Sequence, residues 1–237
     1  MTMSTAIVTG GSQGLGRALV RTLHDLGWNV VTDSRHADGL AASVVGLDPE
    51  RVRGIAGDLT DDAHRRALVE AADRFGELTL VVNNASSIGP SPMPRLVDYP
   101  LAAWRDLYEI DVVAPLALLQ LAVPRLVPGG QVFSISSDAA VEGYEGWGGY
   151  GSAKAALDQL TRVLAAEHPD LAVYRVDPGD MRTQMHQDAF PGEDISDRPE
   201  PETSIPGLLA LVLGDYPSGR YLARQVAPQR AATEVRP

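Results

Sequence analysis

The stretch Thr9-Gly10-Gly11-Ser12-Gln13-Gly14-Leu15-Gly16 decides the fold of this chain. It follows a short apolar strand expected over residues 6–9 and opens a helix with Leu15, Leu19, Leu23 and Leu26 on one stripe. Glycines allow the backbone to turn tightly and to approach a pyrophosphate, which the free N–H groups and dipole of a helix N-terminus attract. The order of strand, glycine turn and helix therefore predicts a dinucleotide site at the start of the chain.

Outward from this turn, apolar β-branched runs alternate with helical patterns. Further strands are expected at 29–33, 52–56, 78–83, 131–136, 171–177 and 218–222. Helices are expected near 40–46 and over 61–75, 101–127, 150–168 and 208–213, with bends or boundaries at Pro115 and Pro124. This alternation predicts an α/β fold: a doubly wound, Rossmann-like parallel sheet in three α/β/α layers, as a single domain over residues 1–237.

Two segments depart from the alternation. Residues 184–205 carry Pro191, Pro199 and Pro201 together with six acidic side chains. Long loops in compact domains are usually functional or disordered, so we predict a substrate lid there. The polar segment 224–237 is predicted to be a flexible tail.

Composition limits the classes of function. The chain has 237 residues, 44% of them hydrophobic, no Cys, and 20 basic against 31 acidic side chains, which gives a net charge of −11. Without Cys, disulfides, thiolate metal sites and a Cys nucleophile are excluded, and the His spacing indicates no metal. No basic stripe predicts a nucleic-acid partner. No run approaches roughly 18 uninterrupted apolar residues and no secretory signal is recognised, so we expect a cytoplasmic protein with no membrane partner.

Further motifs follow the glycine turn in order along the chain. They are Asp58-Leu59, Asn83-Asn84-Ala85-Ser86, Ser137, Tyr150-Gly-Ser-Ala-Lys154, Pro178-Gly179 and Thr183. With the Thr-Gly-x-x-x-Gly-x-Gly spacing, this series resembles the short-chain dehydrogenase/reductase superfamily over nearly the whole chain. The likeness is nearest to sepiapterin-reductase-like members, although the carboxylate that grips a pterin in them corresponds to Ala223 here.

The resemblance implies a nicotinamide dinucleotide cofactor and a set of contacts to it. These are Gly10, Ser12, Gln13, Gly14, Leu15, Gly16, Ser34, Arg35, Asp58, Leu59, Asn84, Ala85, Ser86, Tyr150, Lys154, Pro178, Gly179, Met181 and Thr183.

The end of the second strand bears on the choice of cofactor. The acid that selects NAD in the family would fall at Ser34, and Arg35 follows it. A guanidinium suits the 2′-phosphate of NADPH. The competing feature is Asp33, because a strand that ended one residue earlier would bring its carboxylate to the ribose 2′-hydroxyl of NAD. NADPH is favoured and NAD stays possible.

The resemblance also assigns catalytic roles. Tyr150 would donate a proton to the carbonyl oxygen during reduction, Lys154 would tune Tyr150 and bind the nicotinamide ribose, and Ser137 would hold the substrate oxygen. Because an ammonium stabilises a nearby phenolate, Lys154 is expected to lower the pKa of Tyr150. Asp111 stands where the family has a catalytic Asn whose backbone holds a relay water, and its carboxylate could alter the charge balance of Lys154.

The substrate is expected beyond the carboxyl ends of the strands, in contact with Ser137, Tyr144, Trp147 and Met185. The first hypothesis is an NADPH-dependent ketoreductase that acts on a small or medium organic carbonyl and works as a homodimer or homotetramer. The alternatives are an NAD-linked alcohol dehydrogenase and a low-turnover dinucleotide-binding sensor or assembly protein.

Overall fold

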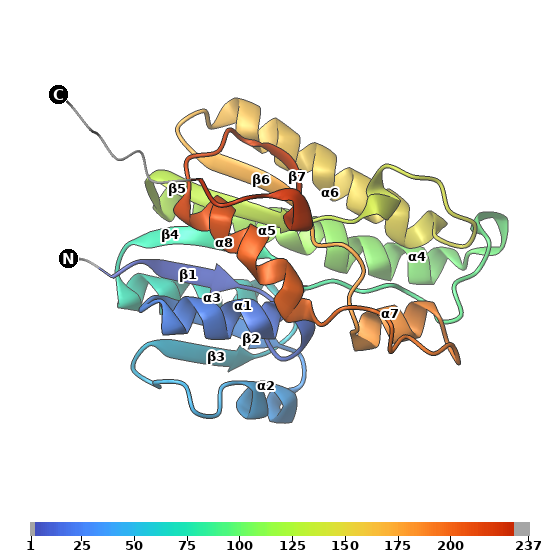
Figure 1. Cartoon of the computed structure of the whole chain (residues 1–237), viewed down its shortest axis with the longest axis horizontal. Coiled ribbons are helices and arrows are strands. Elements are labelled where there is room, and N and C mark those ends of the chain that lie inside the picture. The colour runs from blue at the N-terminus through green and yellow to red at the C-terminus, as the bar shows by residue number, and fades with distance from the viewer. Residues whose placement is uncertain (1–2, 230–237) are drawn as a thin grey trace.

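The computed structural model describes residues 3–229 and contains one seven-stranded sheet. Its strands are β1 (Thr5–Val8), β2 (Asn29–Ser34), β3 (Val52–Ala56), β4 (Leu78–Asn83), β5 (Leu126–Ile135), β6 (Ala172–Asp177) and β7 (Gly219–Leu222). All neighbours pair in parallel, in the order β3-β2-β1-β4-β5-β6-β7 (Figure 1). The winding direction reverses between β1 and β4, which places a ligand crevice outside the carboxyl ends of these strands.

Helices cover both faces of the sheet, as the sequence predicts. They are α1 (Gly14–Asp25), α2 (Ala37–Ser43), α3 (Asp62–Phe75), α4 (Leu101–Tyr108), α5 (Ala114–Ala122), α6 (Gly148–Glu167), α7 (Gln184–Ala189) and α8 (Ile205–Leu213). Alternate residues of one strand enter opposite cores: Ala6 and Val8 pack with α1 and α8, whereas Ile7 packs with α3 and α5. A strand buried on both faces must be apolar throughout, which explains the uninterrupted β-branched runs.

The region predicted as two helices over 101–127 is one interrupted helical run. A π-helical segment, Glu109–Val113, separates α4 from α5, and Pro115 lies in the first turn of α5, where a missing N–H costs no hydrogen bond. In the described part of the chain, Leu101–Arg125 is long and apolar enough to span a membrane by length and composition. Charged residues interrupt it, so the expectation of no uninterrupted apolar run of that length is not contradicted. Its fully buried residues Ala114, Leu118 and Ala122 pack in the core.

Two local predictions need correction. Leu26 is not in the core but 48% exposed, because α1 ends at Asp25. The β5 strand begins at Leu126 rather than 131, since a register irregularity lets its first residues pair with β4. The flexible tail expected over 224–237 stays a prediction; within it, the Gln229 side-chain amide donates to the Asp215 carbonyl at 2.8 Å. The rest of the predicted tail, 230–237, lies outside the described residues.

Candidate active site

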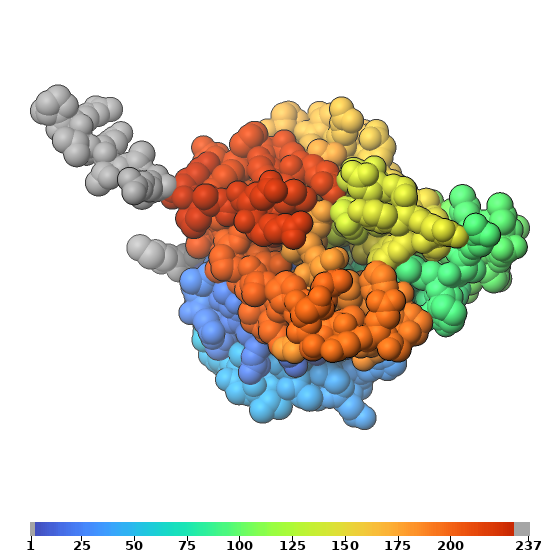
Figure 2. All heavy atoms as spheres, turned by 45° about the vertical axis from the view of Figure 1, so that its right-hand side comes forward, coloured from blue at the N-terminus to red at the C-terminus, as the bar shows by residue number. Residues whose placement is uncertain are grey.

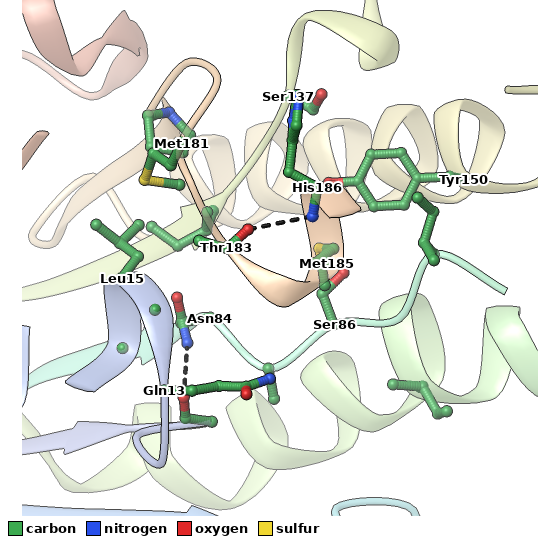
Figure 3. A pocket seen from close by; sticks show the side chains of 18 of the residues that line it. Gln13, Leu15, Asn84, Ser86, Ser137, Tyr150, Met181, Thr183, Met185 and His186 are labelled. Atoms are coloured by element: carbon green, nitrogen blue, oxygen red, sulfur yellow. Dashed lines mark hydrogen bonds between the residues drawn. The ribbon is translucent and has the colours of Figure 1, made fainter. Parts of the chain in front are cut away.

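A cavity of about 410 Å³ lies at the carboxyl ends of the strands. Every cofactor contact implied by the family resemblance lines it, from Gly10 through Thr183. So do three of the four expected substrate contacts, Ser137, Trp147 and Met185. Figure 3 shows Gln13, Leu15 and Asn84 at one end of this space and Ser137 and Tyr150 at the other. One continuous cavity therefore joins the glycine turn to the predicted catalytic residues.

The glycine turn is held from beneath by β4. The Asn84 side-chain amide donates to the carbonyl oxygens of Thr9 at 2.8 Å and Gly10 at 3.2 Å. A Cβ atom at Gly16 would collide with the Gly10 carbonyl and with the Asn84 amide. This close approach explains why the third glycine of the motif admits no side chain, and it leaves a backbone cradle of the kind that binds pyrophosphate.

Asp33 is anchored under the same turn. Its Oδ1 accepts the Gly10 N–H at 2.7 Å, and its Oδ2 lies 3.0 Å from Nε2 of His64. Only 3% of the Asp33 side chain and 6% of the His64 side chain are exposed. Both carboxylate oxygens therefore have protein partners, although Asp33 also borders the cavity. Arg35, two residues on, is exposed at the cavity rim and takes part in none of the ion pairs of the described residues.

The three predicted catalytic side chains come together from two elements. Ser137 follows the end of β5, and Tyr150 and Lys154 lie one turn apart at the start of α6. The Lys154 Nζ donates to the Ile135 carbonyl at 3.1 Å and lies 5.5 Å from the centre of the Tyr150 ring. Figure 3 shows Ser137 and Tyr150 directed into the same part of the cavity.

The pKa of Tyr150 is shifted in the direction opposite to the one expected from the sequence. Burial raises it, the Asp111 carboxylate raises it further, and the Ser137 hydroxyl works in the other direction. The expectation of a lowered pKa considered Lys154 alone; it omitted the cost of placing a phenolate in a buried site.

Asp111 does not line the cavity, and its carboxylate lies near Lys154 as the sequence analysis expected. It lies in the middle of the π-helical segment, fully buried behind Lys154, with 4.0 Å between its Oδ2 and the Lys154 Nζ. Its Oδ2 accepts from the Ser86 hydroxyl and its Oδ1 from the Ser87 N–H, each at 2.8 Å. Burial raises the pKa of this carboxyl, and Lys154 and the two hydrogen bonds oppose the rise.

The substrate end of the cavity has an aromatic wall. Trp147 meets the Tyr150 ring edge-on at 5.8 Å between centroids and meets Phe190 at 5.9 Å. Tyr144 does not line the cavity: the residue is 46% exposed and its hydroxyl donates to Asp138 at 3.0 Å, so its contact with the substrate stays a prediction. In an irregular loop, residue spacing does not predict which way each side chain points. The sequence therefore could not show that Trp147 faces the cavity and Tyr144 does not.

Sequence reasoning missed Arg220, which contacts the predicted catalytic residue Ser137. From β7 its guanidinium donates to the Ser137 carbonyl at 2.8 Å, to Asp158 of α6 at 3.3 Å and to Asp177 of β6 at 3.4 Å. It therefore joins the backbone of Ser137 to the helix that carries Tyr150. The only feature of the sequence that could have pointed to Arg220 is the presence of an arginine inside an otherwise apolar edge strand.

Comparisons with known proteins agree with this geometry. The family model described as short chain dehydrogenase matches residues 4–194. The chain belongs to the short-chain dehydrogenase family. A short-chain dehydrogenase of this kind is an NAD(P)-dependent oxidoreductase, so the enzyme class predicted from the motifs is confirmed.

Relatives and solved structures extend over most of this short-chain dehydrogenase. An uncharacterized oxidoreductase of Saccharomyces cerevisiae is 33% identical over 76% of this chain and 71% of its own. A benzil reductase of the same yeast, named as (S)-benzoin forming, is 30% identical over 77% and 73%. A short-chain dehydrogenase from Shigella flexneri in complex with NADP superposes with a TM-score of 0.85 at 26% identity, over 94% of this chain and 98% of that one.

The finer likeness to sepiapterin-reductase-like members stays a prediction. Ala223, which takes the place of their pterin-gripping carboxylate, is 1% exposed and packs in the core. A pterin amino group would find no anion at this position.

Proposed function

We propose that this short-chain dehydrogenase reduces the carbonyl group of a small or medium organic ketone with NADPH. The supporting observation is a single cavity with Ser137, Tyr150 and Lys154 at one end and, at the other, Arg35, which forms no ion pair with another residue of the described range 3–229. The cofactor, when bound, supplies the hydride. The protein supplies proton transfer, orientation and charge.

Tyr150 acts as the general acid toward the carbonyl oxygen. A phenol is protonated at neutral pH, which is the state that reduction requires, and the burial that raises the pKa of Tyr150 favours this form further. Ser137, whose hydroxyl now donates to Asp138 at 2.9 Å, turns this donor to the same oxygen. Lys154 lies behind both and holds the strand end through the Ile135 carbonyl. Asp111 touches none of the reacting atoms and is a positioning residue for Lys154.

The preference for NADPH over NADH rests on Arg35 and on the engagement of Asp33. An acid selects NAD by accepting hydrogen bonds from the ribose hydroxyl, but both oxygens of Asp33 already accept from Gly10 and His64. Arg35 can form charge-assisted bonds with a 2′-phosphate. The NADP complex of the Shigella flexneri neighbour is consistent with this choice.

Three further features belong to the proposal. Residues 184–205 would form the substrate lid: α7 brings Met185, His186 and Ala189 to the cavity, and Ser91 donates to the Asp188 carbonyl at 2.7 Å. Figure 2 shows this segment beside the loop around residue 90. The exposed apolar side chains Leu101, Val113 and Leu116 would pair two copies into a homodimer or homotetramer. The cytoplasmic location stays a prediction.

The test is oxidation of NADPH or NADH at 340 nm over a panel of ketones, diketones (benzil among them), quinones and pterins. We expect turnover with NADPH, and its loss in Tyr150→Phe with NADPH binding retained. Tyr108→Phe, which lies outside the cavity, is the matched control and should keep full activity. Tight binding of NADPH without turnover on any compound would instead favour the low-turnover sensor.

A further inference from the structure

Ser86 and Asp111 lie 25 positions apart in the chain and are in direct contact. Asp111 is fully buried, and each of its oxygens has one donor, the Ser86 hydroxyl and the Ser87 N–H. Lys154, 2% exposed, is the cation beside it. A buried carboxylate and a buried ammonium are each costly alone, and they are tolerated when they face each other and their hydrogen bonds are satisfied.

Other acids nearby have different partners. Asp158, on the same helix as Lys154, and Asp177, at the end of β6, are both engaged by Arg220. Asp138 is exposed and accepts from Ser137 and Tyr144. Among the described residues, Asp111 is thus the buried carboxylate that faces Lys154 without a second cation.

We propose that Ser86 and Asp111 form a charge relay behind the active site: Ser86 holds Asp111 ionised, and Asp111 holds Lys154 protonated at alkaline pH. This goes beyond the assigned roles of Tyr150, Lys154 and Ser137, and it rests on the proposed function only for its catalytic consequence.

Burial lowers the pKa of Lys154, and Asp111 is the main group that opposes this, followed by Asp158. The same Asp111 charge raises the pKa values of Tyr150 and, to a lesser extent than burial, of Tyr99. Without the carboxylate, Lys154 and Tyr150 would therefore both lose their protons more readily. Carbonyl reduction needs both groups protonated, so loss of either proton inactivates the enzyme.

The chain offers an unusually direct probe, because Lys154 is its only lysine. Protein labelled with ¹³Cε,¹⁵Nζ-lysine, carrying a lysine-free tag, gives one side-chain signal, and its pH titration reports the ammonium of Lys154 without substrate or cofactor. We expect the titration midpoint of Asp111→Asn to fall by about one pH unit or more, since opposite charges at this range shift pKa values by that amount. The exposed acid of the same π-helical segment provides the matched control, Glu109→Gln, which should leave the midpoint in place.

Ser86→Ala tests the effect of Ser86 on Asp111 separately from the effect of Asp111 on Lys154. It keeps the Asp111 charge at alkaline pH, so the Lys154 midpoint should not move there. The loss of one hydrogen bond to the carboxylate should raise the pH at which Asp111 takes up its proton, seen as a second inflection of the lysine signal at acidic pH.

An unchanged or raised midpoint in Asp111→Asn, or an equal fall in Glu109→Gln, would overturn the proposal. Where the wild type reduces a ketone, the alkaline limb of kcat/KM should move with the lysine midpoint. Absence of turnover would refute the proposed reaction and leave the titration result standing, so the two failures are distinguishable.

Discussion

Replacement of Arg35 by Gln should weaken NADPH binding and leave NADH binding unchanged. Arg35 follows β2 directly and lies exposed at the rim of the cavity, beside Ser34. Hydrogen bonds to charged groups contribute about 1.5–3 kcal/mol. Because this side chain is exposed to solvent, the lower figure applies, and about 1.5 kcal/mol corresponds to roughly a tenfold rise in Kd.

The measurement is a fluorescence titration of each cofactor at low and at physiological salt. The NADPH effect should shrink as salt rises, because exposed charges are screened. Arg53→Gln is the matched control, since Arg53 is an exposed arginine on the neighbouring β3 that does not line the cavity. Equal losses for NADPH and NADH, or an equal loss in Arg53→Gln, would refute the assignment of Arg35 to the 2′-phosphate.

Three other outcomes are expected. Asp33→Ala should weaken the binding of NADPH and of NADH by the same factor and lower the free energy of unfolding by about 3 kcal/mol, because it leaves His64 and the Gly10 N–H unpaired. Urea unfolding and cofactor titration measure these two effects. A change in the ratio of the two cofactor affinities would contradict the prediction. Gly16→Ala should raise the Kd for NADPH at least about tenfold by displacing the turn, whereas Gly39→Ala, where an added Cβ meets only ordinary contacts, should bind normally in the same titration. Leu208→Ala should destabilise the fold by about 2–5 kcal/mol in urea, and Leu213→Ala on the same helix, 64% exposed, should have little effect; similar losses would contradict the assigned core.

Several features of this protein could be predicted from short stretches of its sequence. The glycine turn at 10–16 and the start of the helix that follows it can be recognised as a phosphate cradle from their own residues. The run at 78–82 contains one polar residue, Thr79, and is apolar enough to be buried on both faces, which is typical of a parallel sheet. Tyr150 and Lys154 share one helix face because of the helical period alone.

Contacts between distant segments required the tertiary structure. The sequence placed Asp33 beside a possible ribose contact, but its partners Gly10 and His64 come from two other elements. The sequence marks Asp111 as unusual at its position and Ser86 as the last residue of the motif at 83–86, yet neither position indicates that the two side chains touch. The same holds for Arg220 on the Ser137 carbonyl, across 83 positions of chain.

The physical reason is the distance along the chain between the residues that interact. Periodicity, turns and caps depend on neighbours a few residues away, so they can be predicted from the sequence. Burial and the pairing of charges depend on which surfaces the packed layers bring together. The pKa of Tyr150 shows the difference: its neighbour along the helix, Lys154, predicts a lowered value, and the folded environment of burial and Asp111 raises it.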